Sequence, residues 1–164
     1  MKKLPFFRLI LSLSLPLAVG YIGSMVTTPA IDGWYATLNR PSFAPPNWLF
    51  APVWTGLFLL MGLAFFLVWN TKIKKNAPKK QLLKKEALLS FITQLIFNFI
   101  WSYLFFGQQL LWTAFIEILV LWILIANTII SFEKIKPLAA YLMIPYILWV
   151  SFAAMLNFSF ALIN

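Results

Sequence analysis

The amino-acid sequence predicts an all-α integral membrane protein: a single bundle of five transmembrane helices with its N-terminus inside the cell and its C-terminus outside. Three observations predict this fold class. Of the 164 residues, 62% are hydrophobic and only 10% are charged, whereas an ordinary soluble domain is about one-quarter charged. Five apolar stretches approach or exceed the length of about 20 residues that a spanning helix needs. Nearly all the cations lie in segments that one end of such a bundle would share.

The five predicted spans form one domain over residues 1–164. They are residues 9–26, 48–68, 88–106, 111–130 and 138–163. Lipid offers no hydrogen bonds to the backbone, so helix is the expected structure of each span. Proline is tolerated in the first turn of a helix, which suits Pro46 and Pro137. The short break at Gly107 predicts that the third and fourth spans are antiparallel neighbours.

Orientation follows from the lysines and arginines, because cytoplasmic loops of membrane proteins carry an excess of them. Cations precede the first span and recur in the connections at residues 72–85 and 134–136. Arg40 is the one cation elsewhere, and four or six spans would scatter the lysines over both faces. This topology accounts for the net charge of +9 without nucleic-acid binding. An alternative for the first residues is a cleaved secretory signal, but the apolar run from Tyr21 to Val26 favours a retained span.

The chain contains no cysteine and no histidine. Their absence excludes disulfides, the usual zinc sites with nitrogen and sulfur ligands, a His-based triad and the usual His or Cys ligation of haem iron. The acidic residues are too scattered to suggest a catalytic pair: Asp32, Glu86, Glu117 and Glu133. We therefore predict no metal site, no obligatory cofactor and no conventional catalytic constellation.

Residues 27–46 form a long connection between the first two spans. Trp34, Tyr35 and Phe43 lie in it, together with several prolines, and a disordered loop would carry few aromatic residues. We expect a structured loop that folds back over the outer end of the bundle as a lid. The alternative is an aromatic belt that rests at the lipid headgroups.

Three blocks of sequence carry a resemblance to a known family. They are residues 34–50 (WYATLNRPSFAPPNWLF) with Pro52-Val53-Trp54; Gln94-Leu95, Asn98, Trp101-Ser102 and Phe105-Phe106; and Pro145-Tyr146, Trp149, Phe152-Ala153 and Leu156-Asn157. In this order they closely resemble the translocator protein family, also called tryptophan-rich sensory proteins or peripheral benzodiazepine receptors. The resemblance covers nearly the whole chain.

The resemblance implies a five-helix bundle, usually a homodimer, in a bacterial cytoplasmic membrane. It also implies an outward-side pocket beneath the first loop that binds tetrapyrroles such as protoporphyrin IX, with haem as a further candidate, and synthetic benzodiazepine-site ligands. Animal members are linked to sterol through an aromatic residue followed by a cation near the end of the fifth helix. Residues 157–164 contain no cation, so we do not expect sterol binding by that motif.

Helical spacing supports such a pocket. In the third span Gln94, Asn98 and Trp101 share a face with Phe105, although interhelical hydrogen bonding is the alternative role for the amides. The predicted ligand-binding residues are Trp34, Tyr35, Arg40, Pro45, Trp54, Phe58, Gln94, Asn98, Trp101, Phe105, Trp149 and Ala153.

Three of these residues have specific predicted roles. Trp54 and Trp149, from different helices, are placed to stack on a flat macrocycle, although an aromatic stripe is more often core. Arg40 is placed to pair with a porphyrin propionate, with an interfacial anchor as the alternative. Glu117, a lone carboxylate in the fourth span, is a functional candidate by default, and we assign it no role.

The leading functional hypothesis is a membrane receptor, sensor or carrier for tetrapyrroles. One alternative is a light-dependent enzyme that degrades porphyrin, in which Trp54 and Trp149 would be the reactive residues. A second alternative is a regulatory interaction protein whose pocket sets its conformation. The expected partners are the lipid bilayer, a porphyrin-type small molecule and a second copy of the chain.

Overall fold

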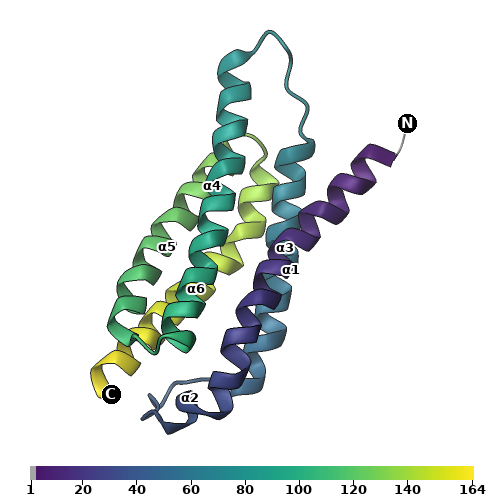
Figure 1. Ribbon diagram of the computed structural model, residues 1–164. Coiled ribbons are helices and arrows are strands. Elements are labelled where there is room, and N and C mark those ends of the chain that lie inside the picture. The colour runs from purple at the N-terminus through teal and green to yellow at the C-terminus, as the bar shows by residue number, and fades with distance from the viewer. Residues whose placement is uncertain (1–2) are drawn as a thin grey trace.

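The computed structural model describes residues 3–164, and it is built of helices that run lengthwise side by side (Figure 1). The long helices are α1 (Lys3–Asp32), α3 (Phe50–Asn70), α4 (Pro78–Ser102), α5 (Leu111–Glu133) and α6 (Pro137–Ile163). Short elements join them: α2 (Trp34–Thr37), the 3-10 turn η1 (Asn47–Leu49) and the π-helical turn η2 (Tyr103–Gly107). Within the described residues, five helices are long and apolar enough to cross a membrane, which confirms the predicted fold class.

The five long helices form a closed ring in the order α1, α3, α6, α5 and α4, in which each packs on the next. The predicted antiparallel pairing of the third and fourth spans is confirmed, because α4 packs along α5 after the short break. The core lies along the inner faces of these helices and includes Met61, Phe91, Leu121 and Val150.

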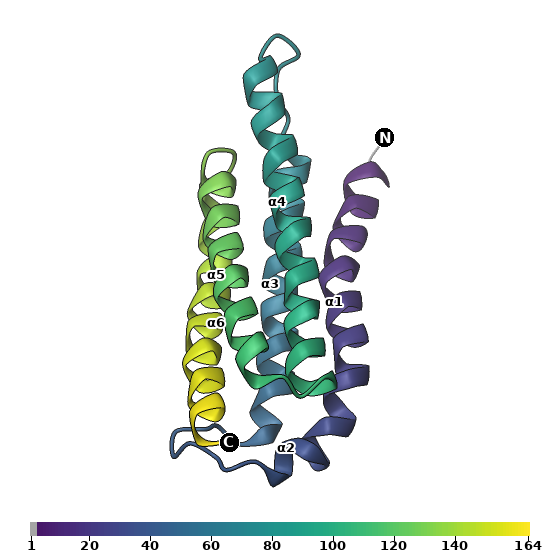
Figure 2. The ribbon, with the colours of Figure 1, turned by 60° about the vertical axis from the view of Figure 1, so that its left-hand side comes forward.

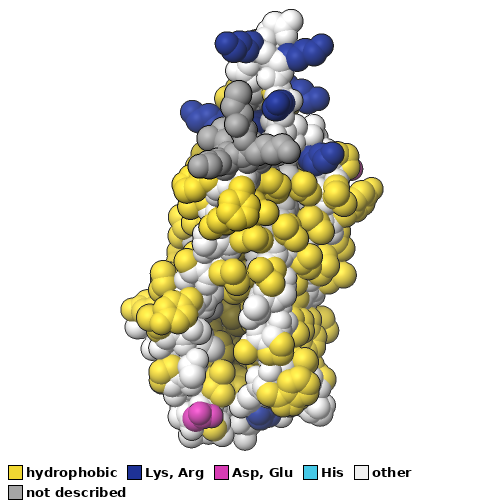
Figure 3. All heavy atoms as spheres, turned by 90° about the vertical axis from the view of Figure 1, so that its right-hand side faces the viewer, with side chains coloured by type: hydrophobic (Ala, Val, Ile, Leu, Met, Phe, Trp, Pro, Cys, Tyr) yellow, Lys and Arg dark blue, Asp and Glu magenta, His cyan; other side chains and the backbone are white. Residues whose placement is uncertain are grey.

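Apart from Arg40, the cations of the described residues gather at one end of the bundle (Figure 3). The N-terminus lies at this end, together with the connection between α3 and α4 and that between α5 and α6, whereas α2 and the C-terminus lie at the opposite end (Figures 1 and 2). This is the arrangement that the positive-inside rule requires of five spans. The side of the membrane that each end faces stays a prediction, and we call the end with α2 the outer end.

Two helices extend well beyond their predicted spans. The first helix does not end at residue 26 but continues to Asp32, so the predicted loop over residues 27–46 begins too early. Pro29 lies inside α1. A proline inside a membrane helix frees a backbone carbonyl from its hydrogen bond, and it is tolerated because neighbouring groups in the bundle can satisfy that carbonyl. The third helix begins at Pro78, ten residues before the predicted span, because a hydrophobicity pattern does not detect a polar, lysine-rich helical extension.

Candidate functional site

The outer end of the bundle is closed by α2 and the loop at residues 38–46. Tyr35 of α2 is only 3% exposed. Its ring centroid lies 5.6 Å from that of Phe106 and 5.2 Å from that of Phe160. Trp34 contacts Phe105 edge-on at 5.9 Å. Aromatic side chains from α2, η2 and α6 thus form one cluster beneath the loop.

Asparagine side chains attach the loop to the end of α6. The backbone N–H of Asn39 donates to Oδ1 of Asn164 at 2.8 Å, and Nδ2 of Asn164 donates to the carbonyl of Asn39 at 3.1 Å. Nδ2 of Asn39 also donates to the carbonyl of Ile163 at 3.2 Å. We call these three hydrogen bonds the asparagine latch.

Arg40 is held within the same loop. Its Nη2 donates to the carbonyl of Pro45 at 2.8 Å. Its guanidinium carbon lies 5.6 Å from the centre of the Tyr35 ring, in a cation–π arrangement. Both partners hold the cation above the aromatic cluster, and the side chain remains exposed.

The π-helical turn η2 shapes the wall of the site. The N–H of Gln108 donates to the carbonyl of Tyr103 at 2.8 Å, five residues earlier. Such turns shift the register of a helix by one residue and occur often at functional sites. Here the consecutive residues Phe105 and Phe106 both contact the Tyr35 ring, which a regular helix would make difficult.

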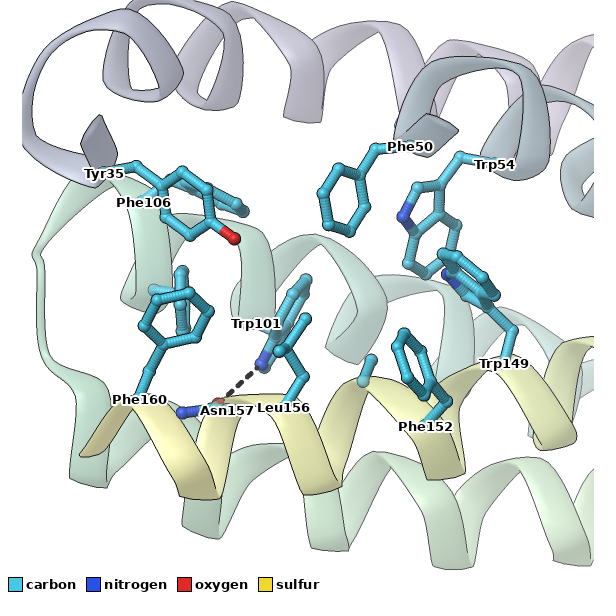
Figure 4. Close-up of a pocket in the computed structure, with 12 residues that line it drawn as sticks. Tyr35, Phe50, Trp54, Trp101, Phe106, Trp149, Phe152, Leu156, Asn157 and Phe160 are labelled. Carbon is cyan, nitrogen blue, oxygen red and sulfur yellow. Dashed lines mark hydrogen bonds between the residues drawn. The ribbon is translucent and has the colours of Figure 1, made fainter. Parts of the chain in front are cut away.

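A small inner pocket of about 30 Å³ lies between α3, α4 and α6 beneath Tyr35 (Figure 4). The predicted pair Trp54 and Trp149 both line it, together with Ala153. The Trp149 ring lies 5.5 Å from Phe152 and 6.3 Å from Phe50. A pocket of this volume is far below the range of about 300–1,000 Å³ typical of ligand pockets, so it leaves no room for a macrocycle between the two indoles.

A much larger cavity of about 390 Å³ lies between α1, α3 and α4. Its lining shares five residues with the small pocket: Tyr35, Phe50, Trp54, Trp101 and Phe106. These five side chains border both spaces, so the two lie next to each other. Phe58 lines the large cavity and stacks on Trp54 with ring centroids 5.5 Å apart.

Sequence reasoning missed the contribution of α1 to this cavity. Nine residues of α1 line it: Leu17, Val19, Gly20, Tyr21, Gly23, Ser24, Thr27, Thr28 and Ile31. The signal was present, because glycine and hydroxyl residues recur at helical spacing between Gly20 and Thr28. The search for aromatic and amide residues passed over these small side chains.

Hydrogen bonds between α4, α5 and α6 hold in place the helices next to the two spaces. Nδ2 of Asn98 donates to the hydroxyl of Tyr146 at 3.1 Å. Nε1 of Trp101 donates to Oδ1 of Asn157 at 3.1 Å, and Nδ2 of Asn157 donates to the carbonyl of Leu111 at 2.9 Å. Asn98 and Trp101 also line the large cavity. Asn98 therefore lines the cavity and also makes an interhelical hydrogen bond.

Four of the predicted site residues line neither space. Gln94 is fully buried one turn from Asn98, and neither atom of its amide group has a hydrogen-bond partner within the described residues. Trp34, Arg40 and Pro45 lie in the covering layer above. The other eight, from Tyr35 to Ala153, line one space or both.

Glu117 is buried on α5, six residues after the start of that helix, or about 9 Å along its axis. Neither carboxylate oxygen has a hydrogen-bond partner within the described residues. It lines neither space, and the geometry gives it no role in the site.

Comparison with known proteins agrees with this architecture. The model of the TspO/MBR family matches residues 12–163. The chain belongs to the TspO/MBR family. It is therefore an integral, multi-pass membrane protein.

Relatives of this TspO/MBR member span bacteria and animals. It is 41% identical to the tryptophan-rich protein TspO of Chlorobaculum tepidum, over 95% of each chain. It is 34% identical to the translocator protein of Ovis aries, over 85% of this chain and 79% of that one. It is also 34% identical to the tryptophan-rich sensory protein of Cereibacter sphaeroides, over 87% of this chain and 85% of that one.

Proposed function

We propose that this TspO/MBR protein is a membrane receptor, acting as a sensor or carrier, that binds a tetrapyrrole such as protoporphyrin IX beneath the outer loop. The observation that carries the proposal is the cavity of about 390 Å³, which is within the range of about 300–1,000 Å³ typical of ligand pockets. The names of the relatives, tryptophan-rich sensory protein and translocator protein, support a sensing or carrying role.

The lining suits a flat, conjugated and largely apolar molecule. Phe50, Trp54, Phe58 and Trp101 present aromatic rings from two helices, and aromatic rings gain from stacked or edge-on contact with one another. Gly20 on α1 lets the Phe58 ring pack directly against the helix backbone, because a Cβ there would overlap the ring. We therefore place the stacked macrocycle in the large cavity, against Trp54, and not between Trp54 and Trp149 as the sequence analysis expected.

Arg40 supplies a cation for the acidic edge of the ligand. Its guanidinium lies over Tyr35, which lines the cavity, and Arg can pair bidentately with a carboxylate. The cavity offers haem iron neither His nor Cys, because the chain has none. A free-base porphyrin therefore fits better than haem, and synthetic benzodiazepine-site ligands are candidates for the same aromatic walls.

A titration of the purified protein with protoporphyrin IX in the dark tests the proposal. We expect saturable quenching of tryptophan fluorescence, and at least tenfold weaker binding for Trp54→Ala. The matched control is Trp48→Ala, since Trp48 is 71% exposed and lines neither space. Replacing Arg40 with Gln should weaken binding of the free acid more than that of its dimethyl ester. Absence of saturable binding by the wild-type protein would refute the proposal that it binds protoporphyrin IX.

A further inference from the structure

Helix α1 makes close contact with the bundle in two separate regions, one against α3 and one against α4 and η2. Near its middle it lies against α3: a Cβ on Gly62 would come within 2.7 Å of the carbonyl oxygen of Ser12, and one on Gly20 would overlap the Phe58 ring. Nearer the outer end it lies against α4 and η2. There a Cβ on Gly23 would be 3.8 Å from Oγ of Ser102, and one on Gly107 would be 2.8 Å from Val26.

Between these two contact regions, residues on the facing sides of α1 and α3 form part of the wall of the large cavity. Its lining includes exposed residues of both helices: Tyr21, Ser24 and Thr28 on α1, and Ala51 and Thr55 on α3. Because these residues are both exposed and part of the lining, the cavity opens sideways between the two helices. Figure 3 shows a furrow on this face, in the half of the molecule away from the lysine cluster. We call this opening the α1–α3 gap.

The gap lies at the height of the bilayer. Both of its walls belong to helices that are long and apolar enough to span the membrane. Large apolar side chains next to the gap point outward, including Ile22 at 50% and Met25 at 59% exposure. In a membrane-spanning bundle such side chains face lipid.

The polar groups of the gap suit contact with lipid. The hydroxyl of Ser24 donates to the carbonyl of Tyr21 at 2.7 Å, and that of Thr55 donates to the carbonyl of Ala51 at 2.8 Å. Each hydroxyl is thus satisfied by its own helix, which removes most of the cost of placing it in an apolar medium. The described residues that line the cavity include no charged side chain.

At the outer end, α2 and the loop cover part of the cavity. Tyr35 is buried under the loop, and the asparagine latch holds the loop to α6. A ligand that approaches the outer end from solution meets this covering layer, whereas a ligand dissolved in the bilayer meets an opening.

We propose that the α1–α3 gap is a lateral portal through which an apolar, flat ligand enters the cavity from the bilayer, and that the loop is not the entrance. This inference rests on the proposed function for the identity of the ligand. It assigns Ser24, Thr28 and Thr55 to the mouth of the portal.

A first measurement needs no ligand. The chain has no native cysteine, so Thr55→Cys carries a single nitroxide spin label in proteoliposomes. We expect dissolved oxygen to broaden its spectrum at least fivefold more than a water-soluble nickel chelate does. Met25→Cys serves as the lipid-facing reference and Asn76→Cys as the aqueous one. A Thr55 label that behaves like the Asn76 label would overturn the portal.

A second measurement follows the kinetics. Protoporphyrin IX is delivered from protein-free vesicles to proteoliposomes, and quenching of tryptophan fluorescence reports its arrival. We expect the double variant Ser24→Phe/Thr55→Phe to slow association and dissociation at least tenfold each, because a blocked mouth hinders passage of the ligand in both directions. Met25→Phe, next to Ser24 but outside the lining, should match the wild-type protein.

The outcomes separate the two proposals. Unchanged rates in the double variant, with faster rates in Asn39→Ala, would show that the ligand enters under the loop and would overturn the portal while leaving tetrapyrrole binding intact. A wild-type protein that never binds protoporphyrin IX would refute the proposed function, and the spin-label measurement would then decide alone whether the gap opens to lipid.

Discussion

Asn98 of α4 and Tyr146 of α6 are joined by a hydrogen bond of 3.1 Å in the core of the bundle. Tyr146 is completely buried, and Asn98 is 4% exposed. The Trp54 ring lies edge-on to the Tyr146 ring at 6.2 Å. The hydrogen bond therefore joins two helices and holds Tyr146 beside the indole that borders both the small pocket and the large cavity.

Removal of the Tyr146 hydroxyl should destabilise the bundle modestly. Tyr146→Phe leaves the Asn98 amide without its acceptor, and interhelical hydrogen bonds in membrane proteins contribute about 0.6–2 kcal/mol. We expect Tm in detergent to fall by about 1–8 °C, at about 2–4 °C per kcal/mol for a chain of this size. Tyr141→Phe is the matched control, because Tyr141 is 67% exposed and should leave Tm unchanged. An equal fall in both variants would mean that the hydrogen bond contributes nothing specific.

Gln94 should respond in the opposite way from Asn98. Its amide is buried without a partner in the described residues, and an unpaired buried polar group costs about 1–3 kcal/mol. We therefore expect Gln94→Met to leave Tm unchanged or raise it, whereas Asn98→Leu lowers it. Thermal unfolding of both variants in the same detergent makes the comparison. A clear loss of stability in Gln94→Met would show that the amide is satisfied, for example by a buried water.

Loss of the asparagine latch should loosen the loop without unfolding the bundle. Asn164→Ala removes two of the three hydrogen bonds between the loop and the end of α6. We expect amide hydrogen exchange at residues 38–44 to accelerate at least tenfold, and exchange in α5 to stay the same. Asn70→Ala, at the other end of the bundle, is the control. Protection that persists at residues 38–44 would indicate that Arg40 and Tyr35 hold the loop without the latch.

Illumination tests the enzymatic alternative. The Trp54 indole lines the large cavity, so a porphyrin bound there would lie against an oxidisable side chain. If the protein degrades porphyrin, light should bleach the bound pigment in the wild-type protein and not in the Trp54→Phe/Trp149→Phe double variant. Pigment absorbance is measured in the dark and under light, with free pigment in detergent as the control. Saturable binding without protein-dependent bleaching would leave a sensor or carrier, and uptake into sealed vesicles would separate these two.

Helical spacing correctly places several of the predicted residues on a common face. Asn98, Trp101 and Phe105 share the inner side of α4 and η2, and all three line a pocket. Gln94 obeys the same spacing and yet lies outside both spaces. Periodicity gives the direction of a side chain around its helix, but it does not say how far along the helix a cavity extends.

The sequence by itself determined the five spans, the grouping of the cations at one end and the aromatic character of the site. Those properties follow from the hydrophobicity and length of each span and from the distribution of Lys and Arg between spans, which act on each helix separately. Only the tertiary structure decided that the space between Trp54 and Trp149 is nearly closed and that the large cavity lies against α1. The size of a cavity depends on how closely neighbouring helices approach, and that distance is set by pairs such as Gly20 with Phe58 and Gly23 with Ser102. Such pairs come from distant parts of the chain, so no local pattern contains them.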